Sequence, residues 1–209
     1  MIELLHGDFF DIYKNLPKGQ IIITDPPFNA GKSFDNDNLT DDKWVEFCNK
    51  FSDCLKEIEP VNVICEISKK DIEMQKALDR NFTRKWIIVL NYTNSMRNGG
   101  VGYSNTGIVL YYGGKVFKRY KDRIDSACFN TMKEFSHPSP KQIIHYQKLC
   151  EMFCNKELTI IDPFMGSGTT GIGAVNNGQN FIGIEKNKDY YEIAKNRIEQ
   201  AQQDVAPKV

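Results

Sequence analysis

The fold is decided by residues 21–29, IIITDPPFN, in which three isoleucines lead into an acid, two prolines and an aromatic residue. An uninterrupted β-branched run of this kind predicts a strand that is buried on both faces of a parallel sheet. Pro26 and Pro27 lack the N–H that would extend the strand. Asp25 is therefore expected at the carboxyl end of the strand, where open α/β sheets bind their ligands.

The residues after the strand offer a specific set of chemical groups. The carboxylate of Asp25 and the carbonyl of Pro26 can each accept one hydrogen of an exocyclic amine, and the ring of Phe28 can stack on a base. These groups suit a planar heterocycle that carries an NH2 group. A strand end followed by an ordinary Pro-Pro turn explains the same residues, and this stretch alone does not separate the two interpretations.

The composition predicts one domain over residues 1–209. The chain is 41% hydrophobic, which is enough for one well-buried core. Lys and Arg number 27, as do Asp and Glu, so a surface that binds nucleic acid must be local. The six cysteines form no C-x-x-C pair, which predicts free thiols and no metal site. With no signal peptide or long apolar run, we expect a soluble cytoplasmic protein that does not contact a membrane.

Apolar runs predict seven strands. The pair at 86–90 and 107–112 has no long helix between its members, so these two are expected to be antiparallel neighbours at one edge of the sheet. Residues 30–39 are predicted to form a polar, mobile loop beside Asp25, and residues 124–136 show little periodicity. The other predicted strands cover residues 2–5, 21–24, 61–67, 158–161 and 181–184.

A glycine-rich segment forms the second predicted site. Residues 166–171, GSGTTG, follow a predicted strand and match G-x-G-x-x-G, and Glu185 ends the next strand. Such glycines let the backbone approach a nucleotide, and the acid can bind both hydroxyls of a ribose. An NAD-dependent dehydrogenase is therefore a rival interpretation. Two features favour another cofactor: Asp162 would repel a pyrophosphate but suit an ammonium group, and the motif begins too late for a second nucleotide-binding half.

Three segments resemble motifs of the DNA amino-methyltransferases. They are DPPF at 25–28, HPSPK at 137–141 and DPFMGSGTT at 162–170, in the order of the family's circularly permuted β type. The resemblance implies a single Rossmann-like, S-adenosylmethionine-dependent methyltransferase domain. Its mostly parallel seven-stranded sheet would carry an antiparallel edge strand. The resemblance excludes about 113–136, where the family inserts its target-recognition region.

The resemblance also implies roles for individual residues. Glu185 would bind the ribose of S-adenosylmethionine, Asp8 would lie near its adenine, and Ser139 and Lys141 would bind its methionine carboxylate. Family members usually carry Thr and Pro where this chain has Ser139 and Gln142. The implied catalytic residues are Asp25, Pro26, Pro27 and Phe28, and the implied cofactor-binding residues are Asp8, Ser139, Lys141, Asp162, Phe164, Gly166, Ser167, Gly168, Thr169 and Glu185.

The implied activity is methylation of adenine N6 in double-stranded DNA, by direct transfer to a flipped-out base. Relatives that act on cytosine N4 more often carry Ser in place of Asp25, so that activity is the main alternative. An RNA methyltransferase and a non-catalytic DNA-binding module are further alternatives. Because the insert is short, we expect a short target site or a homodimer that grips the duplex; the sequence identifies no partner restriction nuclease. The predicted phosphate-binding residues are Lys115, Lys118, Arg119, Lys121 and Arg123.

Overall fold

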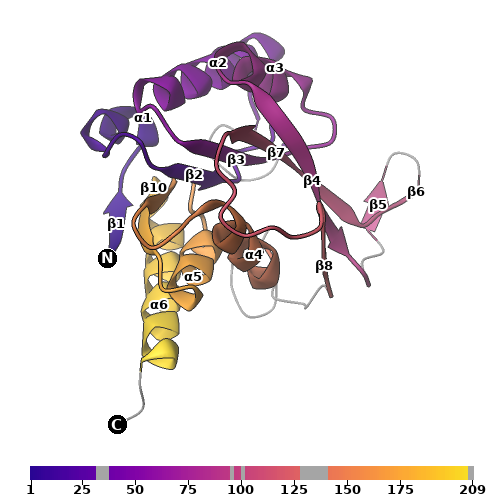
Figure 1. Ribbon diagram of the computed structural model, residues 1–209. Coiled ribbons are helices and arrows are strands. Elements are labelled where there is room, and N and C mark those ends of the chain that lie inside the picture. Colours follow the sequence, from indigo (N-terminus) through magenta and orange to yellow (C-terminus); the bar gives the residue numbers. More distant parts are fainter. Residues whose placement is uncertain (32–37, 95–96, 100–101, 128–140, 207–209) are drawn as a thin grey trace.

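The computed structural model describes residues 1–31, 38–94, 97–99, 102–127 and 141–206. Eight strands form one sheet in the order β1-β10-β9-β2-β3-β7-β4-β8, with helices on both faces (Figure 1). The strands are β1 (Ile2–His6), β2 (Ile21–Thr24), β3 (Asn62–Ile67), β4 (Arg84–Tyr92), β7 (Thr106–Gly113), β8 (Arg123–Ser126), β9 (Thr159–Asp162) and β10 (Asn180–Glu185).

The helices divide into two layers, and each layer covers one face of the sheet (Figure 1). None of the helices in the described ranges is both long and apolar enough to span a bilayer. A hairpin of β5 (Arg97–Gly99) and β6 (Gly102–Ser104) stands apart from the main sheet. One layer holds α1 (Phe9–Ile12) with its 3-10 turn (Tyr13–Asn15), α2 (Asp41–Glu57) and α3 (Ile72–Asn81), and the other holds α4 (Ile143–Phe153), α5 (Thr169–Asn176) and α6 (Lys188–Val205).

Strand β2 is the centre of the core. Ile21 and Ile23 pack with the layer of α4, α5 and α6, whereas Ile22 packs with the layer of α1, α2 and α3. All three side chains are completely buried. Burial of such a side chain contributes roughly 1.5–3 kcal/mol, so this strand ties both layers together. The prediction of a strand buried on both faces is confirmed.

The site lies where the chain changes direction across the sheet. Strand β2 pairs in parallel with β9 on one side and with β3 on the other. From β9 the chain continues through α5 to β10, and from β2 it continues through α2 to β3, so the two connections diverge. The carboxyl ends of β2 and β9 therefore border one crevice, the usual position of ligands in such sheets.

The predicted α/β class is confirmed, but two details of the sheet differ. Strands β4 and β7 are antiparallel neighbours as expected, yet β7 lies inside the sheet, between β3 and β4. An eighth strand, β8, covers the edge of β4 and runs parallel to it. Its residues, Arg123–Ser126, include a single large apolar side chain, Ile124, which is buried. The backbone pairing with β4 holds this strand in place, and hydrophobic periodicity could not reveal it.

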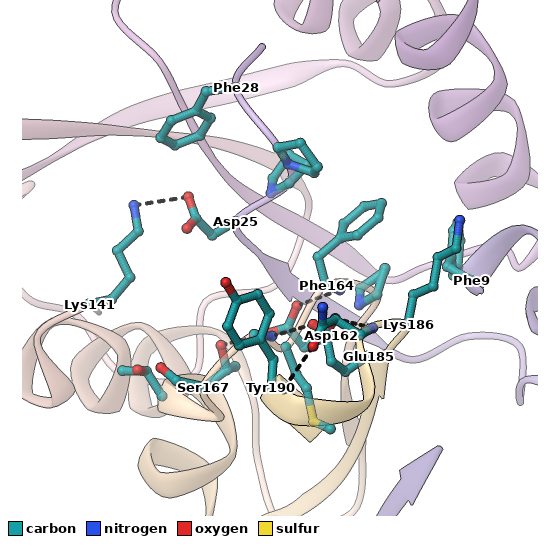
Figure 2. Close-up of a pocket in the computed structure, with 18 of the residues that line it drawn as sticks. Phe9, Asp25, Phe28, Lys141, Asp162, Phe164, Ser167, Glu185, Lys186 and Tyr190 are labelled. Carbon is teal, nitrogen blue, oxygen red and sulfur yellow. Dashed lines mark hydrogen bonds and ion pairs between the residues drawn. The ribbon is translucent and has the colours of Figure 1, made fainter. Parts of the chain in front are cut away.

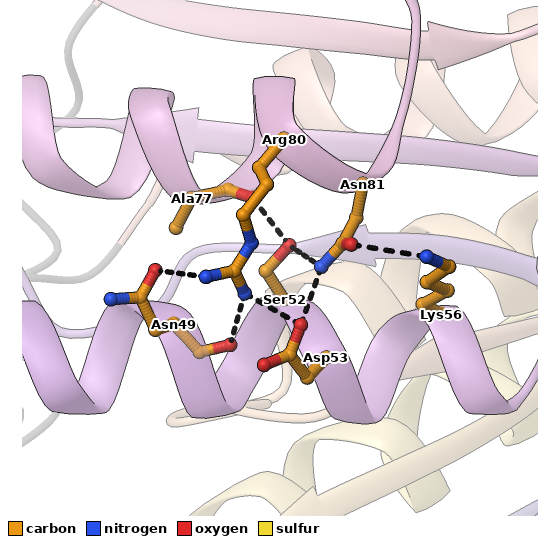
Figure 3. A network of polar contacts seen from close by, with 7 residues as sticks. All are labelled: Asn49, Ser52, Asp53, Lys56, Ala77, Arg80 and Asn81. Carbon is orange, nitrogen blue, oxygen red and sulfur yellow. Dashed lines mark hydrogen bonds and ion pairs between the residues drawn. The ribbon is translucent and has the colours of Figure 1, made fainter.

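Helices α2 and α3 are joined by a polar network as well as by their apolar faces (Figure 3). Asn81 donates to the hydroxyl of Ser52 at 3.0 Å and to the carboxylate of Asp53 at 2.7 Å. Arg80 donates to the same carboxylate at 2.6 Å. The hydroxyl of Ser52, which is completely buried, donates to the carbonyl of Ala77 at 2.7 Å, so it is satisfied.

Helix α5 is short and lies tightly between its neighbours. A Cβ atom on Gly173 would lie 2.9 Å from the backbone nitrogen of Gln147 in α4, and one on Gly171 would lie 2.5 Å from Ile198 in α6. Both approaches are closer than van der Waals contact allows. The two glycines therefore let α5 sit close to both helices, which places the amino end of α5 at the crevice.

We predict that Gly173→Val destabilises the protein by about 1–3 kcal/mol, the usual cost of overpacking a close contact. The obstacle is backbone of α4, which cannot move aside as a flexible side chain can. Urea unfolding would measure the change. Gly114→Val is the matched control, because nothing lies within 4 Å of a Cβ atom at Gly114. Equal stabilities of the two variants would contradict the packing described for α5.

Candidate active site

A pocket opens at the carboxyl ends of β2, β9 and β10 and contains both predicted motifs (Figure 2). The segment after β2 forms one wall, and the glycine loop between β9 and α5 forms another. The lining residues are Gly7, Asp8, Phe9, Asp25, Pro26, Pro27, Phe28, Ala30, Lys141, Tyr146, Asp162, Pro163, Phe164, Met165, Gly166, Ser167, Thr169, Thr170, Glu185, Lys186, Asn187 and Tyr190.

The glycine loop is shaped by left-handed backbone and by one carboxylate. Gly166 has φ 52° and Gly168 has φ 82°, conformations that glycine adopts without strain. The carboxylate of Glu185 accepts from the N–H of Gly166 at 3.0 Å and from the N–H of Asn187 at 2.7 Å. Glu185 thus fixes the start of the loop while its side chain remains on the pocket wall.

Asp162 is a buried acid at the junction of β9 and the loop. Its carboxylate accepts from the hydroxyl of Thr170 at 2.6 Å and from the N–H of Phe164 at 3.1 Å. Burial raises the pKa of Asp162 to about 6, although these hydrogen bonds oppose the change. A cationic group in the pocket would stabilise the ionised form.

The far end of the pocket combines an aromatic wall with a charged rim. Phe164 packs against Phe51, with ring centres 5.3 Å apart, and against Phe9 at 6.1 Å. Asp8 caps α1 by accepting from the N–H of Phe10 at 2.9 Å, and its other oxygen lies 3.3 Å from the ammonium of Lys186. This end can accommodate a flat apolar ring beside polar groups.

The opposite end of the pocket is built around Asp25. The Lys141 ammonium lies 3.0 Å from Oδ1 of Asp25 and 2.7 Å from Oε1 of Glu66. It also lies over the ring of Phe28, 4.9 Å from the ring centre. Figure 2 shows the ammonium of Lys141 directed at the carboxylate of Asp25, with the ring of Phe28 above this ion pair in the view. The aromatic face, the carboxylate and the cation therefore occupy one small volume.

The charges of this cluster are strongly coupled. Burial raises the pKa of Asp25 to about 7; Lys141 lowers it, but the charge of Glu66 acts in the same direction as burial. Burial alone would lower the pKa of Lys141, yet the two carboxylates keep it above its ordinary value. The lysine therefore stays charged, and Asp25 ionises near neutral pH.

The pocket brings together most of the predicted catalytic and cofactor-binding residues, with two exceptions. Gly168 does not line it: a Cβ atom there would lie 3.0 Å from that of Ala194, so this glycine admits α6 instead. Ser139 lies outside the described residues. Lys141 lines the pocket and its ammonium is paired with two carboxylates, those of Asp25 and Glu66, so its implied contact with the methionine carboxylate stays a prediction.

The predicted phosphate-binding stretch lies apart from the pocket. Its start is at the amino end of β3, where the carbonyl of Lys115 accepts from Asn62 at 2.7 Å. It then contacts the last turn of α4, where the N–H of Phe117 donates to the carbonyl of Met152 at 2.8 Å, before it enters β8. Lys118 is paired with Glu151, and Arg123 with Asp125 at 2.7 Å. The insert 113–136 is described only to residue 127, and the loop 30–39 lacks residues 32–37.

Sequence reasoning missed several wall residues. Tyr146 contributes from the first turns of α4, and Asn187 and Tyr190 contribute from the start of α6. Asn187 could have been found, because it follows Glu185 directly and caps α6 by accepting from the N–H of Asp189 at 2.9 Å. Tyr146 has no comparable local signal. The prediction of free buried thiols is confirmed for the five cysteines described, Cys48, Cys54, Cys65, Cys150 and Cys154.

A doubly covered α/β sheet with a glycine loop and an acid-Pro-Pro-Phe edge in one pocket is the arrangement that an S-adenosylmethionine-dependent methyltransferase requires. Residues 20–196 match the N6/N4 DNA methylase family. Because this match covers most of the chain, the protein belongs to that family. It is a DNA methyltransferase, and its cofactor is S-adenosylmethionine.

Individual relatives agree with this assignment. Type II methyltransferase M.HpaI of Haemophilus parainfluenzae is 28% identical over 94% of this chain and 74% of its own length. The crystal structure of M1.HpyAVI with S-adenosylmethionine is 29% identical, with a TM-score of 0.71 over 94% of this chain and all of that one. The PvuII cytosine-N4-specific DNA methyltransferase shares the fold at 13% identity, with a TM-score of 0.75. The match covers 97% of this chain and 91% of that one.

We predict that Glu185→Ala weakens binding of S-adenosylmethionine by about 1–3 kcal/mol, the range for a lost hydrogen bond to a charged group. The carboxylate both holds the glycine loop and faces the pocket. Isothermal titration calorimetry would measure the affinity. The matched control is Glu192→Ala, an exposed residue of α6. Unchanged affinity for the cofactor, or tight binding of NAD, would contradict the assignment of this half of the pocket.

Proposed function

We propose that this protein methylates the N6 amine of adenine in double-stranded DNA. The observation that carries the proposal is the ionisable Asp25 at the end of β2, in the same pocket as the glycine loop. The choice of adenine rests on Asp25, because relatives that act on cytosine N4 more often carry Ser there. A carboxylate is a stronger hydrogen-bond acceptor than a hydroxyl, so it suits a weakly nucleophilic amine.

The charges of the pocket support S-adenosylmethionine as the bound cofactor. Asp162, Glu185 and Asp8 all lie on its wall, an arrangement that would repel a pyrophosphate. The cofactor carries a sulfonium and an ammonium group and no phosphate. We place its amino-acid part near Asp162, its ribose near Glu185 and its adenine against the aromatic wall at Phe164. When bound, it supplies an electrophilic methyl group.

The residues after β2 act on the target base. One hydrogen of the amine would be accepted by Asp25 and the other by the carbonyl of Pro26, which pulls the nitrogen toward sp3 geometry and takes its lone pair out of conjugation with the ring. Phe28 would stack on the base. The same two acceptors stabilise the positive charge that develops on nitrogen as it gains the methyl group. The nitrogen then loses one proton, for which Asp25, with its raised pKa, is the nearest acceptor.

Asn29, the residue after Phe28, is held in place by two hydrogen bonds to the backbone of Leu39. Its side chain accepts from the N–H of Leu39 at 2.7 Å and donates to the carbonyl of Leu39 at 3.0 Å. Asn29 itself has φ 50°, an uncommon conformation for a residue other than glycine. This two-bond clamp and the two prolines hold Phe28 in position. The stacking surface is thus prepared before a base arrives.

We predict that Asp25→Asn lowers methyl transfer to duplex DNA by at least about a hundredfold, the cost of losing a preorganised charge-stabilising group. Single-turnover transfer from methyl-labelled S-adenosylmethionine would measure it. Cofactor affinity should be retained, because Asp25 faces the base. An undiminished rate in this variant would contradict the catalytic role.

The raised pKa of Asp25 also predicts how the rate of methyl transfer depends on pH. Asp25 must be ionised to accept a hydrogen bond from the amine, and its pKa is raised to about 7. The rate should therefore fall as the pH decreases through about 7 and level off above it. This fall in rate is the acidic limb of the pH profile. The residual rate of Asp25→Asn should show no acidic limb. A wild-type rate that stays constant from pH 8 to pH 5 would show that the ionisation of Asp25 is not required.

Binding of DNA phosphates by the basic stretch is the remaining part of the proposal. Lys118 and Arg123 already have acidic partners, so we assign phosphate contacts to the exposed Arg119 and Lys121. Changing both to alanine should reduce the slope of the logarithm of the DNA-binding constant against the logarithm of the salt concentration. The reduction should be up to about two, one for each lost contact. The control is Lys14→Ala with Lys156→Ala, both also exposed. An equal slope in the two double variants would place the DNA track elsewhere.

A further inference from the structure

Glu66 is a buried acid that the proposed chemistry does not use. It lies on β3, and the residue is only 5% exposed. One oxygen is 2.7 Å from the Lys141 ammonium, and the other accepts from the Tyr146 hydroxyl at 2.7 Å. Tyr146 is also buried, so neither carboxylate oxygen depends on water for a partner. A charged group so enclosed is costly unless it is fully paired.

Several elements of the fold converge on this carboxylate. Strands β2 and β3 pair in parallel, with Thr24 opposite Cys65, so the next residues, Asp25 and Glu66, emerge at the same edge of the sheet. Lys141 lies two residues before α4, and Tyr146 lies in that helix. A Cβ atom at Gly107 in β7 would lie 3.0 Å from Oε1 of Glu66. The glycine therefore leaves room for the carboxylate.

The arrangement determines which oxygen of Asp25 is available. Its Oδ1 atom is buried and faces the Lys141 ammonium, whereas a quarter of the side chain remains exposed to the pocket. A lysine has four rotatable bonds, and a single ion pair would leave its ammonium several positions. Two carboxylates at 3.0 Å and 2.7 Å hold the ammonium at one point between them.

We propose that Glu66, held by Tyr146, is a positioning residue that fixes Lys141 against one oxygen of Asp25 and leaves the other oxygen directed at the target amine. The inference rests on the proposed function, since it gives Asp25 its role toward the base. Glu66 also supplies a second negative charge beside a single ammonium. That excess charge favours proton uptake by Asp25 after methyl transfer.

A purely structural ion pair would have different consequences from a positioning role. Its loss would lower the stability of the fold and leave kcat of the folded enzyme unchanged. In the described residues, the titratable groups that act on Asp25 and Lys141 are Glu66 and Cys65 of β3, Tyr92 of β4, Tyr146 of α4 and Asp162 of β9. Among these groups, the charge of Glu66 raises the pKa of Asp25 the most. Replacing Glu66 by a neutral residue should therefore lower that pKa.

The test uses the full chain with Glu66→Gln and Tyr146→Phe. The chain provides a matched control pair outside the pocket, Tyr13 and Glu57, where a tyrosine hydroxyl also donates to a glutamate, at 3.1 Å. Glu66→Gln should lower kcat about tenfold with KM for S-adenosylmethionine unchanged, because a misplaced reacting group loses rate rather than cofactor binding. Its acidic limb should move to lower pH by about one unit. Tyr146→Phe should lower kcat and leave the limb in place, since the charge of Glu66 remains.

A second measurement does not depend on methylation. The ionisation of Asp25 can be followed by NMR of protein with 13C-labelled aspartate carboxyls, with the signal assigned by Asp25→Asn. In Glu66→Gln the midpoint should fall by about one unit, and in Glu57→Gln it should not move. An unmoved midpoint in Glu66→Gln would overturn the inference, as would a lower kcat with an unmoved acidic limb. If the wild-type protein methylates no DNA, the proposed function fails, and the titration still tests the coupling.

Discussion

The parallel pairing of β2 with β9 is the constraint on which the site depends. The register places Ile21 opposite Ile160 and Ile22 opposite Ile161, so Asp162, the last residue of β9, is level with Ile23, one residue before β2 ends at Thr24. Asp162 at the end of β9 and Asp25 directly after β2 therefore lie within two residues of the same level, and both line the pocket. Because the connections after the two strands lead to opposite sides, to β3 and to β10, a pocket lies between them that both acids line. The pairing itself is stable because β2 is buried by both helical layers.

Buried carboxylates give the pocket its chemical character. Burial raises the pKa of both Asp25 and Asp162, so each acid gains stability from a nearby positive charge. At Asp25 that charge belongs to the protein, because Lys141 is held there by two acids. At Asp162 the described partners are a hydroxyl and an amide, which are neutral. The Asp25 end of the pocket thus already holds its counter-ion, and the Asp162 end is suited to a cationic ligand.

The sequence predicted those features whose chemistry is local. The strand at 21–24, its acid-Pro-Pro-Phe edge and the glycine loop with Glu185 are each recognisable within a few residues, and all lie in one pocket. Contributions that depend on tertiary register were missed. Glu66 lies in an apolar strand and reaches Asp25 only through the pairing of β3 with β2, although a lone acid in such a run is itself a signal. Strand β8 was missed because its backbone pairing leaves no hydrophobic pattern.

We infer that this pocket presents an exocyclic amine of DNA to the cofactor. The most direct measurement is to incubate duplex DNA with the protein and methyl-labelled S-adenosylmethionine, digest the DNA to nucleosides and identify the labelled nucleoside by mass spectrometry. We expect the label in N6-methyl-2′-deoxyadenosine. Label in N4-methylcytosine would keep the amine chemistry and contradict the choice of base. Label on a ring carbon, or no label in DNA, would contradict the claim itself.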